Sequence, residues 1–327
     1  ISEETFAALK DNVIRGLRSF PRQDAYMIVR AYYYAVLNAR DYTPEAKLEV
    51  AESLTLNDVR EFARTLYDRA FVEALVHGNI GADRALEMTR QLQRTLGVEP
   101  IPWEETFAQT YLTQPDGESL TRVDHLEVNN SCFRREYRLG PADPRHRAAI
   151  LILDNFLSRP FFTEMRTNQQ LGYIVFGGTT IRRQSAYLLF IIQSGDYPAD
   201  VLEDRADAFI ADYPKLLTSL PPETFEAYRA AAVEQLKEKP KSISQKGSKF
   251  NIEAFDYDAD FERDAKALEA VEALTQEEVA AMLKRALAEE SRQLLTLLGY
   301  SRDHQTDREV STSWEELEGW KKGRVYK

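Results

Sequence analysis

Apolar residues recur every three or four positions through the first hundred residues, a period that predicts amphipathic helices. In one example Thr55 and Asp58 resemble a capping box, and Val59, Phe62 and Leu66 then fall on one helix face. The pattern predicts helices at 3–17, 24–38, 44–53, 56–68 and 82–95, and one strand at 71–77. This part of the chain is therefore expected to be mostly helical.

Beyond residue 117, helical stretches alternate with short apolar runs that are typical of strands. The strands are predicted at 119–126, 131–138, 172–179, 186–194 and 293–300, and the helices at 145–157, 199–217, 222–237, 260–271 and 275–289. Two of these helices carry clear apolar faces, formed by Phe225, Tyr228, Ala232, Val233 and Leu236 and by Val279, Met282, Leu283 and Ala286. Such faces pack helices on a sheet, so the pattern indicates an α+β fold.

The sequence contains an internal repeat. Residues 4–22 reappear without a gap at 223–241, and Leu54-Thr55 is echoed downstream by Leu274-Thr275. One supersecondary unit is therefore used twice. The second copy follows a long stretch of chain, whereas the first begins at the N-terminus, so we expect the first copy to lack its front half. Because the chain also starts with Ile rather than Met, we interpret it as the C-terminal part of a larger protein.

Composition narrows the classes of partner. The chain has 327 residues, 43% of them apolar, which predicts about two domains, and no apolar run is long enough to cross a bilayer. A net charge of −11 disfavours nucleic acid, which binds basic surfaces. Cys132 is the only cysteine, which excludes an intramolecular disulfide and a thiolate metal cluster and predicts a small buried side chain.

The common catalytic motifs do not occur in this sequence. Its four histidines, His77, His125, His146 and His304, include no pair at the four-residue spacing that places two metal ligands on one helix face. We expect His77 to be a structural imidazole rather than a ligand or a base. The sequence also has no nucleophile elbow and no phosphate-binding loop. The chain alone is therefore predicted to hold no metal site and no complete active site.

One segment is distinctive. The chain reads R-T-N-Q-Q-L-G-Y-I-V-F from Arg166 to Phe176 and L-F-I-I-Q-S from Leu189 to Ser194. Both stretches closely resemble the C-terminal half of the insulinase family, the zinc metallopeptidases that include pitrilysin and insulin-degrading enzyme. The resemblance covers nearly the whole chain and includes the stretches 75–80, 239–241 and 255–261.

The resemblance implies an architecture of four homologous α+β domains, each a mainly antiparallel sheet packed with helices. Residues 1–97 would be the C-terminal half of a truncated third domain, 98–117 a linker, and 118–327 a complete fourth domain with a C-terminal tail. The family's zinc ligands lie in the first domain, in a His-x-x-Glu-His motif that this chain lacks. Zinc is thus expected in the full-length parent and not in this chain, which we expect to be inactive alone.

The same resemblance assigns roles to six residues. Arg166 and Tyr173 would stabilise the substrate carbonyl and the oxyanion, acting in trans to the absent zinc site. The neighbouring positions expected to bind substrate are Gly172, Ile174, Val175 and Phe176, which would offer a strand edge to an extended peptide. From the residues alone, an exposed structural Arg166, a packed Tyr173 and a fully paired interior strand remain alternatives. The lysine-rich run 237–249 is interpreted as a solvated face or loop in preference to a patch that guides substrate.

Two functions remain open at this stage. In the first, the chain is the non-zinc half of a metalloendopeptidase that degrades peptides in an enclosed chamber, with peptide substrates and the zinc-bearing N-terminal half as its partners. In the second, the parent is a degenerate relative that serves as a non-catalytic scaffold or binding subunit. The presence of both Arg166 and Tyr173 favours the first. The resemblance favours the bacterial periplasm as the location, with the cytoplasm as the alternative.

Overall fold

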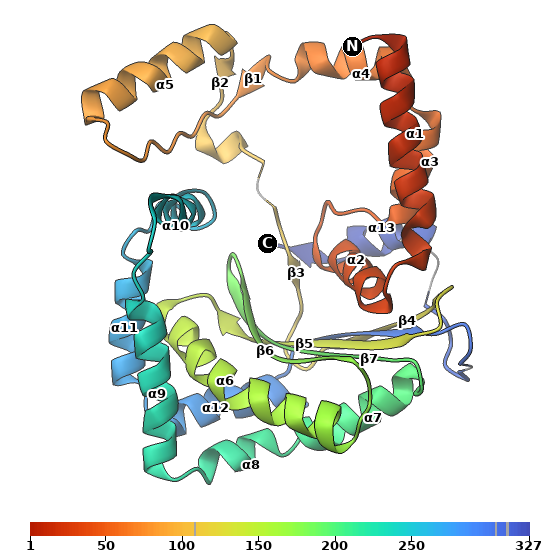
Figure 1. The fold of residues 1–327 in the computed structure, drawn as a ribbon, viewed down its shortest axis with the longest axis vertical. Helices are drawn as coiled ribbons and strands as arrows, with labels where there is room; N and C mark the ends of the chain where they lie inside the picture. The colour runs from red at the N-terminus through yellow and green to blue at the C-terminus, as the bar shows by residue number, and fades with distance from the viewer. Residues whose placement is uncertain (108, 305, 312–313) are drawn as a thin grey trace. The chain divides into compact units, whose positions relative to one another are not determined.

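The computed structural model describes residues 1–107, 109–304, 306–311 and 314–327, and the chain forms two compact units (Figure 1). Unit 1 comprises Ile1–Arg18, Glu45–Gln109 and Lys239–Phe261. Unit 2 comprises Ser19–Pro44, Thr110–Glu238 and Glu262–Lys327. Each unit is therefore assembled from three separate stretches of the chain.

Unit 2 is built on a five-stranded sheet. Its strands are β4 (Ser119–His125), β5 (Ser131–Pro141), β6 (Ile174–Arg182), β7 (Ser185–Ser194) and β8 (Leu294–Tyr300), in the order β4-β8-β5-β7-β6. Only β4 and β8 run parallel, and the other three pairings are antiparallel. The expected fold class, a mainly antiparallel sheet packed with helices, is confirmed.

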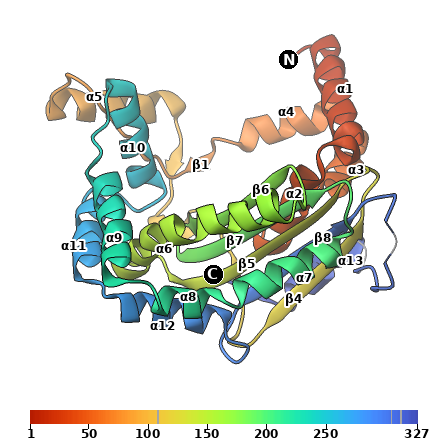
Figure 2. The same ribbon diagram turned by 60° about the horizontal axis from the view of Figure 1, so that its bottom comes forward.

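One face of this sheet is covered by helices from the middle and end of the chain (Figure 2). These helices are α6 (Pro144–Phe162), α7 (Ala199–Ile210), α8 (Tyr213–Thr218), α9 (Pro222–Lys237), α11 (Arg263–Ala273) and α12 (Gln276–Leu287). Both predicted apolar faces pack as expected, since Phe225 on α9 and Val279 and Leu283 on α12 are buried in the core. The single helix expected at 199–217 is instead two, because Pro214 begins a new helix at the first turn of α8.

Helix α2 (Ala25–Leu37) covers the other face of the sheet. Ile28 and Val29 are buried there in a cluster with Leu126, Cys132 and Leu297. The C-terminal tail packs on the same unit through α13 (Trp314–Lys322) and β9 (Val325–Tyr326), which pairs with β3 (Leu112–Thr113). The prediction of a buried Cys132 is confirmed, and burial raises the pKa of its thiol to about 12.

A buried polar cluster lies where α2 meets the sheet. The Tyr33 hydroxyl donates to Glu136 Oε2 at 2.6 Å, and the guanidinium of Arg182 donates to Glu136 Oε1 at 2.7 Å. Arg134 donates to the same carboxylate, and all four side chains are buried. A charge taken out of water is costly unless it is paired, so Glu136 is the common partner on which this cluster depends.

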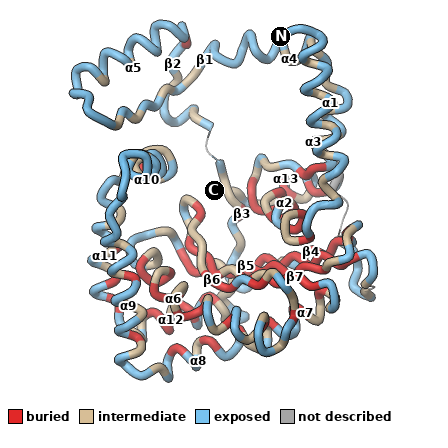
Figure 3. Tube along the Cα trace, in the orientation of Figure 1, coloured by how far each residue is buried: buried red, intermediate tan, exposed pale blue. Residues whose placement is uncertain are grey.

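Unit 1 is mainly helical. It contains α1 (Glu3–Ser19), α3 (Pro44–Ser53), α4 (Leu56–Thr65), α5 (Ala82–Leu96), α10 (Ile243–Phe255), the short helix η2 (Trp103–Glu105), and the two-residue strands β1 (Arg69–Ala70) and β2 (Glu99–Pro100). Helices α1, α4 and α5 contain no buried residue and are mostly pale blue in Figure 3. The predicted apolar face of α4 is thus exposed, with Phe62 63% accessible.

One expectation for unit 1 is wrong. The predicted strand 71–77 has no helix or strand assignment, because β1 ends at Ala70 and pairs only with β2. The apolar run from Leu294 to Gly299, which echoes the run from Val72 to Gly78 in the repeat, instead forms β8, which lies between β4 and β5. A strand needs such neighbours. Helix α10, which the sequence pattern did not predict, contains the second half of the lysine-rich run and begins where the Ser242 hydroxyl accepts from the Gln245 N–H. The lysines of the run are exposed or half-buried, as expected for a solvated face. The stretch 98–117 holds only β2, η2 and β3 among its described residues.

Candidate functional site

The segment that joins α6 to β6 carries Arg166 and Tyr173. Helix α6 begins at Asp143, whose carboxylate accepts from the His146 N–H, and Pro144 occupies its first turn. At its far end α6 runs into η3 (Thr163–Asn168), a turn of π-helix. Phe161 and Met165 are fully buried and anchor the turn in the core. Single π turns recur at functional sites, and this one carries Arg166.

The π turn is held by one carboxylate. Glu164 accepts from Asn168 Nδ2 at 2.7 Å and from Gln169 Nε2 at 2.9 Å. The main chain closes the same loop, since the Gln169 N–H donates to the Glu164 carbonyl at 2.9 Å. The hydrogen bond from Asn168, followed by that from Gln169, lowers the pKa of the Glu164 carboxyl. The ionised carboxylate therefore clamps the backbone on both sides of Arg166.

After this turn the chain bends sharply into β6. Gln170 has a positive φ of 54°, and Leu171 is buried. At Gly172 a Cβ atom would lie 1.9 Å from the carbonyl oxygen of Gln193 on β7. No side chain fits there, so glycine is required by this close approach of two backbones. The bend places Tyr173 immediately before the first residue of β6.

Arg166 and Tyr173 are brought together by this geometry. The guanidinium carbon of Arg166 lies 5.3 Å from the centroid of the Tyr173 ring, within the range of a cation–π contact. The Tyr173 side chain is 84% exposed. Neither the hydroxyl nor the guanidinium has a hydrogen-bond partner among the described residues. The pair therefore presents a hydroxyl donor and a guanidinium donor to solvent at the edge of the sheet.

The other expected substrate-binding residues follow along β6, the outer strand of the sheet. Ile174 is half-buried and Phe176 is 43% exposed, whereas the Val175 side chain is buried in the core. Val175 can therefore offer only its backbone to a ligand. Among the residues that the structure describes, β6 has a neighbouring strand on one side only, so the alternative of a fully paired interior strand is excluded.

Helix α6 limits the open part of this edge. The Thr179 N–H donates to Asp154 Oδ1 on α6 at 2.9 Å, and Gly177 is buried against the Phe161 ring. The edge expected to run from Tyr173 to Thr179 is thus covered in its second half. What remains open is the stretch from Ile174 to Phe176.

Comparison with known proteins agrees with this fold. The domain family described as "PQQ synthase PqqF-like, C-terminal lobe domain 4" matches residues 152–251. A "Nardilysin-like" protein of Arabidopsis thaliana is 28% identical over 298 residues, and the "Insulin-degrading enzyme" of Homo sapiens is 27% identical over 294 residues; each alignment covers 88% of this chain. The solved structure of pitrilysin shares the fold with a TM-score of 0.84 at 19% identity over the full chain.

The chain is similar to the C-terminal part of insulinase-family (M16) peptidases. It corresponds to a C-terminal part of these proteins and spans 29% of the length of the two curated relatives and 35% of the pitrilysin chain. Among the described residues, no helix has the length and apolar character needed to cross a membrane.

The relatives include a protein of Schizosaccharomyces pombe named "Putative zinc protease mug138", which raises the question of a metal site. The described residues contain no group of three or more His, Cys, Asp or Glu side chains that could hold a metal ion. His77 packs edge-on against the Phe250 ring with centroids 5.2 Å apart, and His146 Nδ1 hydrogen-bonds to Asp143 at 2.9 Å. Both imidazoles thus have structural contacts.

Sequence reasoning did not find the residues that hold the segment with Arg166 and Tyr173 in place. The hydrogen bond between Glu164 and Gln169 stabilises the π turn. The backbone carbonyl of Gln193 packs against Gly172. An acidic residue followed four and five positions later by amide side chains was the available signal for the clamp. The contact with Gln193 has no local signal, because that residue lies on another strand.

Proposed function

We propose that this chain is the non-zinc part of an insulinase-family metalloendopeptidase and that Arg166 and Tyr173 stabilise the transition state of peptide hydrolysis. One observation carries the proposal. The Arg166 guanidinium lies over the Tyr173 ring at the open end of a sheet edge, and both donor groups lack partners among the described residues. The similarity to insulinase-family peptidases supplies the reaction class.

The roles follow from the chemistry of amide hydrolysis. Zinc, held by another part of the parent protein, would activate the attacking water. The carbonyl oxygen of the scissile bond gains negative charge as the tetrahedral intermediate forms. The Tyr173 hydroxyl and the Arg166 guanidinium are donors that can hold this oxygen or a neighbouring substrate carbonyl. Removal of one such donor typically lowers turnover by about a hundredfold or more.

The peptide backbone would lie along the start of β6. Ile174 to Phe176 form the uncovered part of the edge strand, and Gly172 holds the chain close to β7 just before it. Pairing through main-chain hydrogen bonds tolerates many sequences, since specificity then depends on the side-chain pockets. This arrangement suits an enzyme that degrades varied peptides.

Peptide hydrolysis by a reconstituted enzyme tests the proposal. A quenched fluorescent peptide is incubated with this chain, with the zinc-bearing N-terminal half, and with both together. We expect turnover only in the mixture, and its loss on addition of a chelator. Arg166→Ala or Tyr173→Phe should lower turnover by about a hundredfold or more while zinc content and circular dichroism stay unchanged.

Exposed residues outside the site provide the matched controls. Arg302→Ala and Tyr67→Phe remove the same chemical groups from side chains that are 64% exposed and 57% exposed, and turnover should not change. Unchanged turnover in the Arg166 and Tyr173 variants would refute their role. A mixture that binds zinc but hydrolyses no peptide would favour the scaffold function instead.

A further inference from the structure

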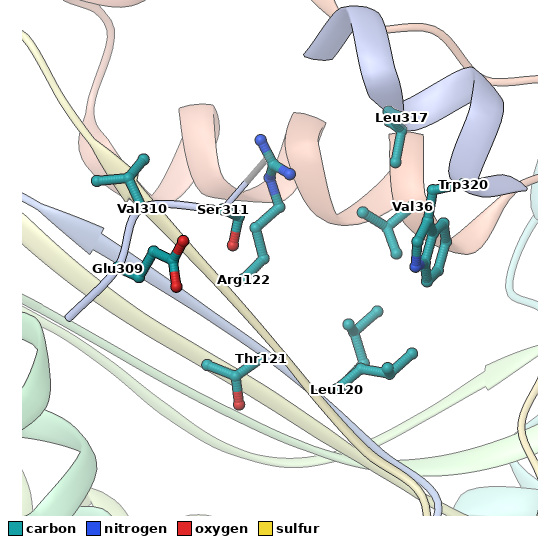
Figure 4. A pocket seen from close by; sticks show the side chains of 10 residues that line it. Val36, Leu120, Thr121, Arg122, Glu309, Val310, Ser311, Leu317 and Trp320 are labelled. Carbon is teal, nitrogen blue, oxygen red and sulfur yellow. The ribbon is translucent and has the colours of Figure 1, made fainter. Parts of the chain in front are cut away.

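Unit 2 contains a pocket at the edge of the sheet opposite β6. Its volume is about 520 Å³, within the usual range for ligand sites, and it lies beside β4 (Figure 4). The apolar part is lined by Val36 of α2, Leu120 of β4 and Leu317 and Trp320 of α13. Thr121, Ser311 and Glu309 contribute polar groups.

The hydrogen-bond pattern of β4 shows which of its backbone groups face outward. The Glu118 carbonyl accepts from Leu294 at 3.0 Å, and the Leu126 N–H donates to Tyr300 at 2.8 Å. Even-numbered residues therefore bond to β8, and the alternation of a strand directs the odd-numbered ones outward. Val123 agrees, because its N–H and carbonyl bond to Ser311 on the outer side. By the same alternation, the N–H and carbonyl of Thr121 point outward.

This edge of β4 already bonds to one residue from the C-terminal part of the chain, Ser311. The Ser311 N–H donates to the Val123 carbonyl at 3.0 Å, and the Ser311 hydroxyl accepts from the Val123 N–H at 2.9 Å. Two residues before Val123 on β4, Thr121 is exposed and lines the pocket. An exposed strand edge with outward backbone groups is a template on which another strand can form.

We propose that the pocket binds an extended peptide segment that pairs with β4 at Thr121 and directs a large apolar side chain between Leu120, Leu317 and Trp320. Side chains of an added strand alternate between the two faces, so every second residue would meet this apolar lining. Arg122 is bonded through two nitrogens to Asp124, which leaves the exposed Glu309 carboxylate as the charge at the rim. A basic residue next to the apolar one would therefore bind more favourably.

This proposal does not depend on the proposed peptidase function, since none of its residues belongs to the Arg166–Tyr173 site. The probe is the blocked hexapeptide Thr-Phe-Thr-Val-Thr-Lys, titrated into the isotope-labelled full chain and followed by amide NMR. We expect the Thr121 amide signal to shift in a saturable way and its hydrogen exchange to slow. The Trp320 indole signal, assigned with Trp320→Phe, should shift with it.

Two changes to the backbone separate strand pairing from non-specific adhesion. Thr121→Pro removes the outward N–H at an edge position that tolerates proline, and should weaken binding about tenfold. Thr121→Val keeps the N–H and should bind as the wild type does. Should Thr121→Pro fail to fold, a probe methylated on alternate backbone nitrogens tests the same bonds with the unaltered chain.

Three results would overturn the proposal. The first is a Thr121 amide that is already protected from exchange in the free chain, since the edge would then be occupied internally. The second is a peptide that protects Ile174 to Phe176 and leaves Thr121 unchanged. The third is equal binding by the methylated and unmethylated probes.

Discussion

Gly172 illustrates how one residue can fix the geometry of the whole site. A Cβ atom at this position would overlap the Gln193 carbonyl oxygen, which belongs to the backbone of a paired strand and cannot rotate away. Gln170, two residues earlier, already has a positive φ. The path of the chain between Arg166 and Tyr173 is therefore set by packing against β7.

Gly172→Ala should displace this loop. The added methyl group requires the two backbones to separate, which we expect to lower the free energy of unfolding by about 1–3 kcal/mol and to reduce turnover of the reconstituted enzyme. Urea unfolding measures the first effect and peptide hydrolysis the second. Gly16→Ala is the matched control: no atom lies within 4 Å of the added Cβ in helix α1, so stability should rise by about 0.5–1 kcal/mol. Equal effects of the two substitutions would contradict the close-approach argument.

At the scale of the element, the π turn depends on the charge of Glu164. Its folded pKa lies below the ordinary value of 4.5, because Asn168 and Gln169 donate to the ionised form. A lowered pKa means that the carboxylate contributes its full stabilisation above pH 4.5 and loses it as the pH falls through the folded value. Acid should therefore loosen the turn that carries Arg166.

Tryptic cleavage after Arg166 can test this clamp. Glu164→Ala removes both acceptor oxygens, so the bond between Arg166 and Thr167 should be cut faster than in the wild type at neutral pH. Glu164→Gln retains one acceptor and should be intermediate. Amide hydrogen exchange of the turn can be measured from pH 6 down to about pH 3. In the wild type, exchange in acid should be faster than the pH dependence of an unstructured amide predicts. Identical exchange profiles for wild type and Glu164→Gln would exclude the clamp.

Helix α2 is held on its sheet by the cluster around Glu136. Glu136→Ala would leave Arg134 and Arg182 buried without their common carboxylate, which should lower the free energy of unfolding by about 3–5 kcal/mol. Tyr33→Phe removes one hydrogen bond and should cost about 1 kcal/mol. Chemical denaturation of both variants measures these free energies of unfolding, and the loss should be larger for Glu136→Ala than for Tyr33→Phe. Tyr42→Phe, at a side chain that is 49% exposed, is the control and should change little.

The sequence predicts elements well where their signals are local. Helices α3 and α9 have the expected bounds, and each has proline in its first turn. The strand expected at 71–77 fails because apolar residues alone cannot make a strand without partners. Helix α10 was not predicted, because lysines and Pro240 obscure its apolar pattern in the sequence. In the structure its Phe250 packs between His77 and Phe261. Likewise, the motif identified Arg166 and Tyr173, but their support by Gln193 depends on pairing between distant segments.

At the scale of the whole molecule, the two copies of the repeat exchange a helix. Helix α2 follows the first repeated segment yet belongs to unit 2, and α10 follows the second repeated segment yet belongs to unit 1. The remaining helices of the first copy lie in unit 1, and those of the second copy in unit 2. The chain therefore visits the two units alternately, in six segments.

This alternation acts as a domain swap within one polypeptide. A break after Gln109 would leave α2 on the N-terminal piece, although Ile28, Val29 and Tyr33 are buried in a cluster that includes residues of the other piece. The same break would leave α10, with its Phe250 packed on His77, attached to the C-terminal piece. A nicked molecule would thus stay together without a covalent link, and neither piece could complete its core unless the other was present.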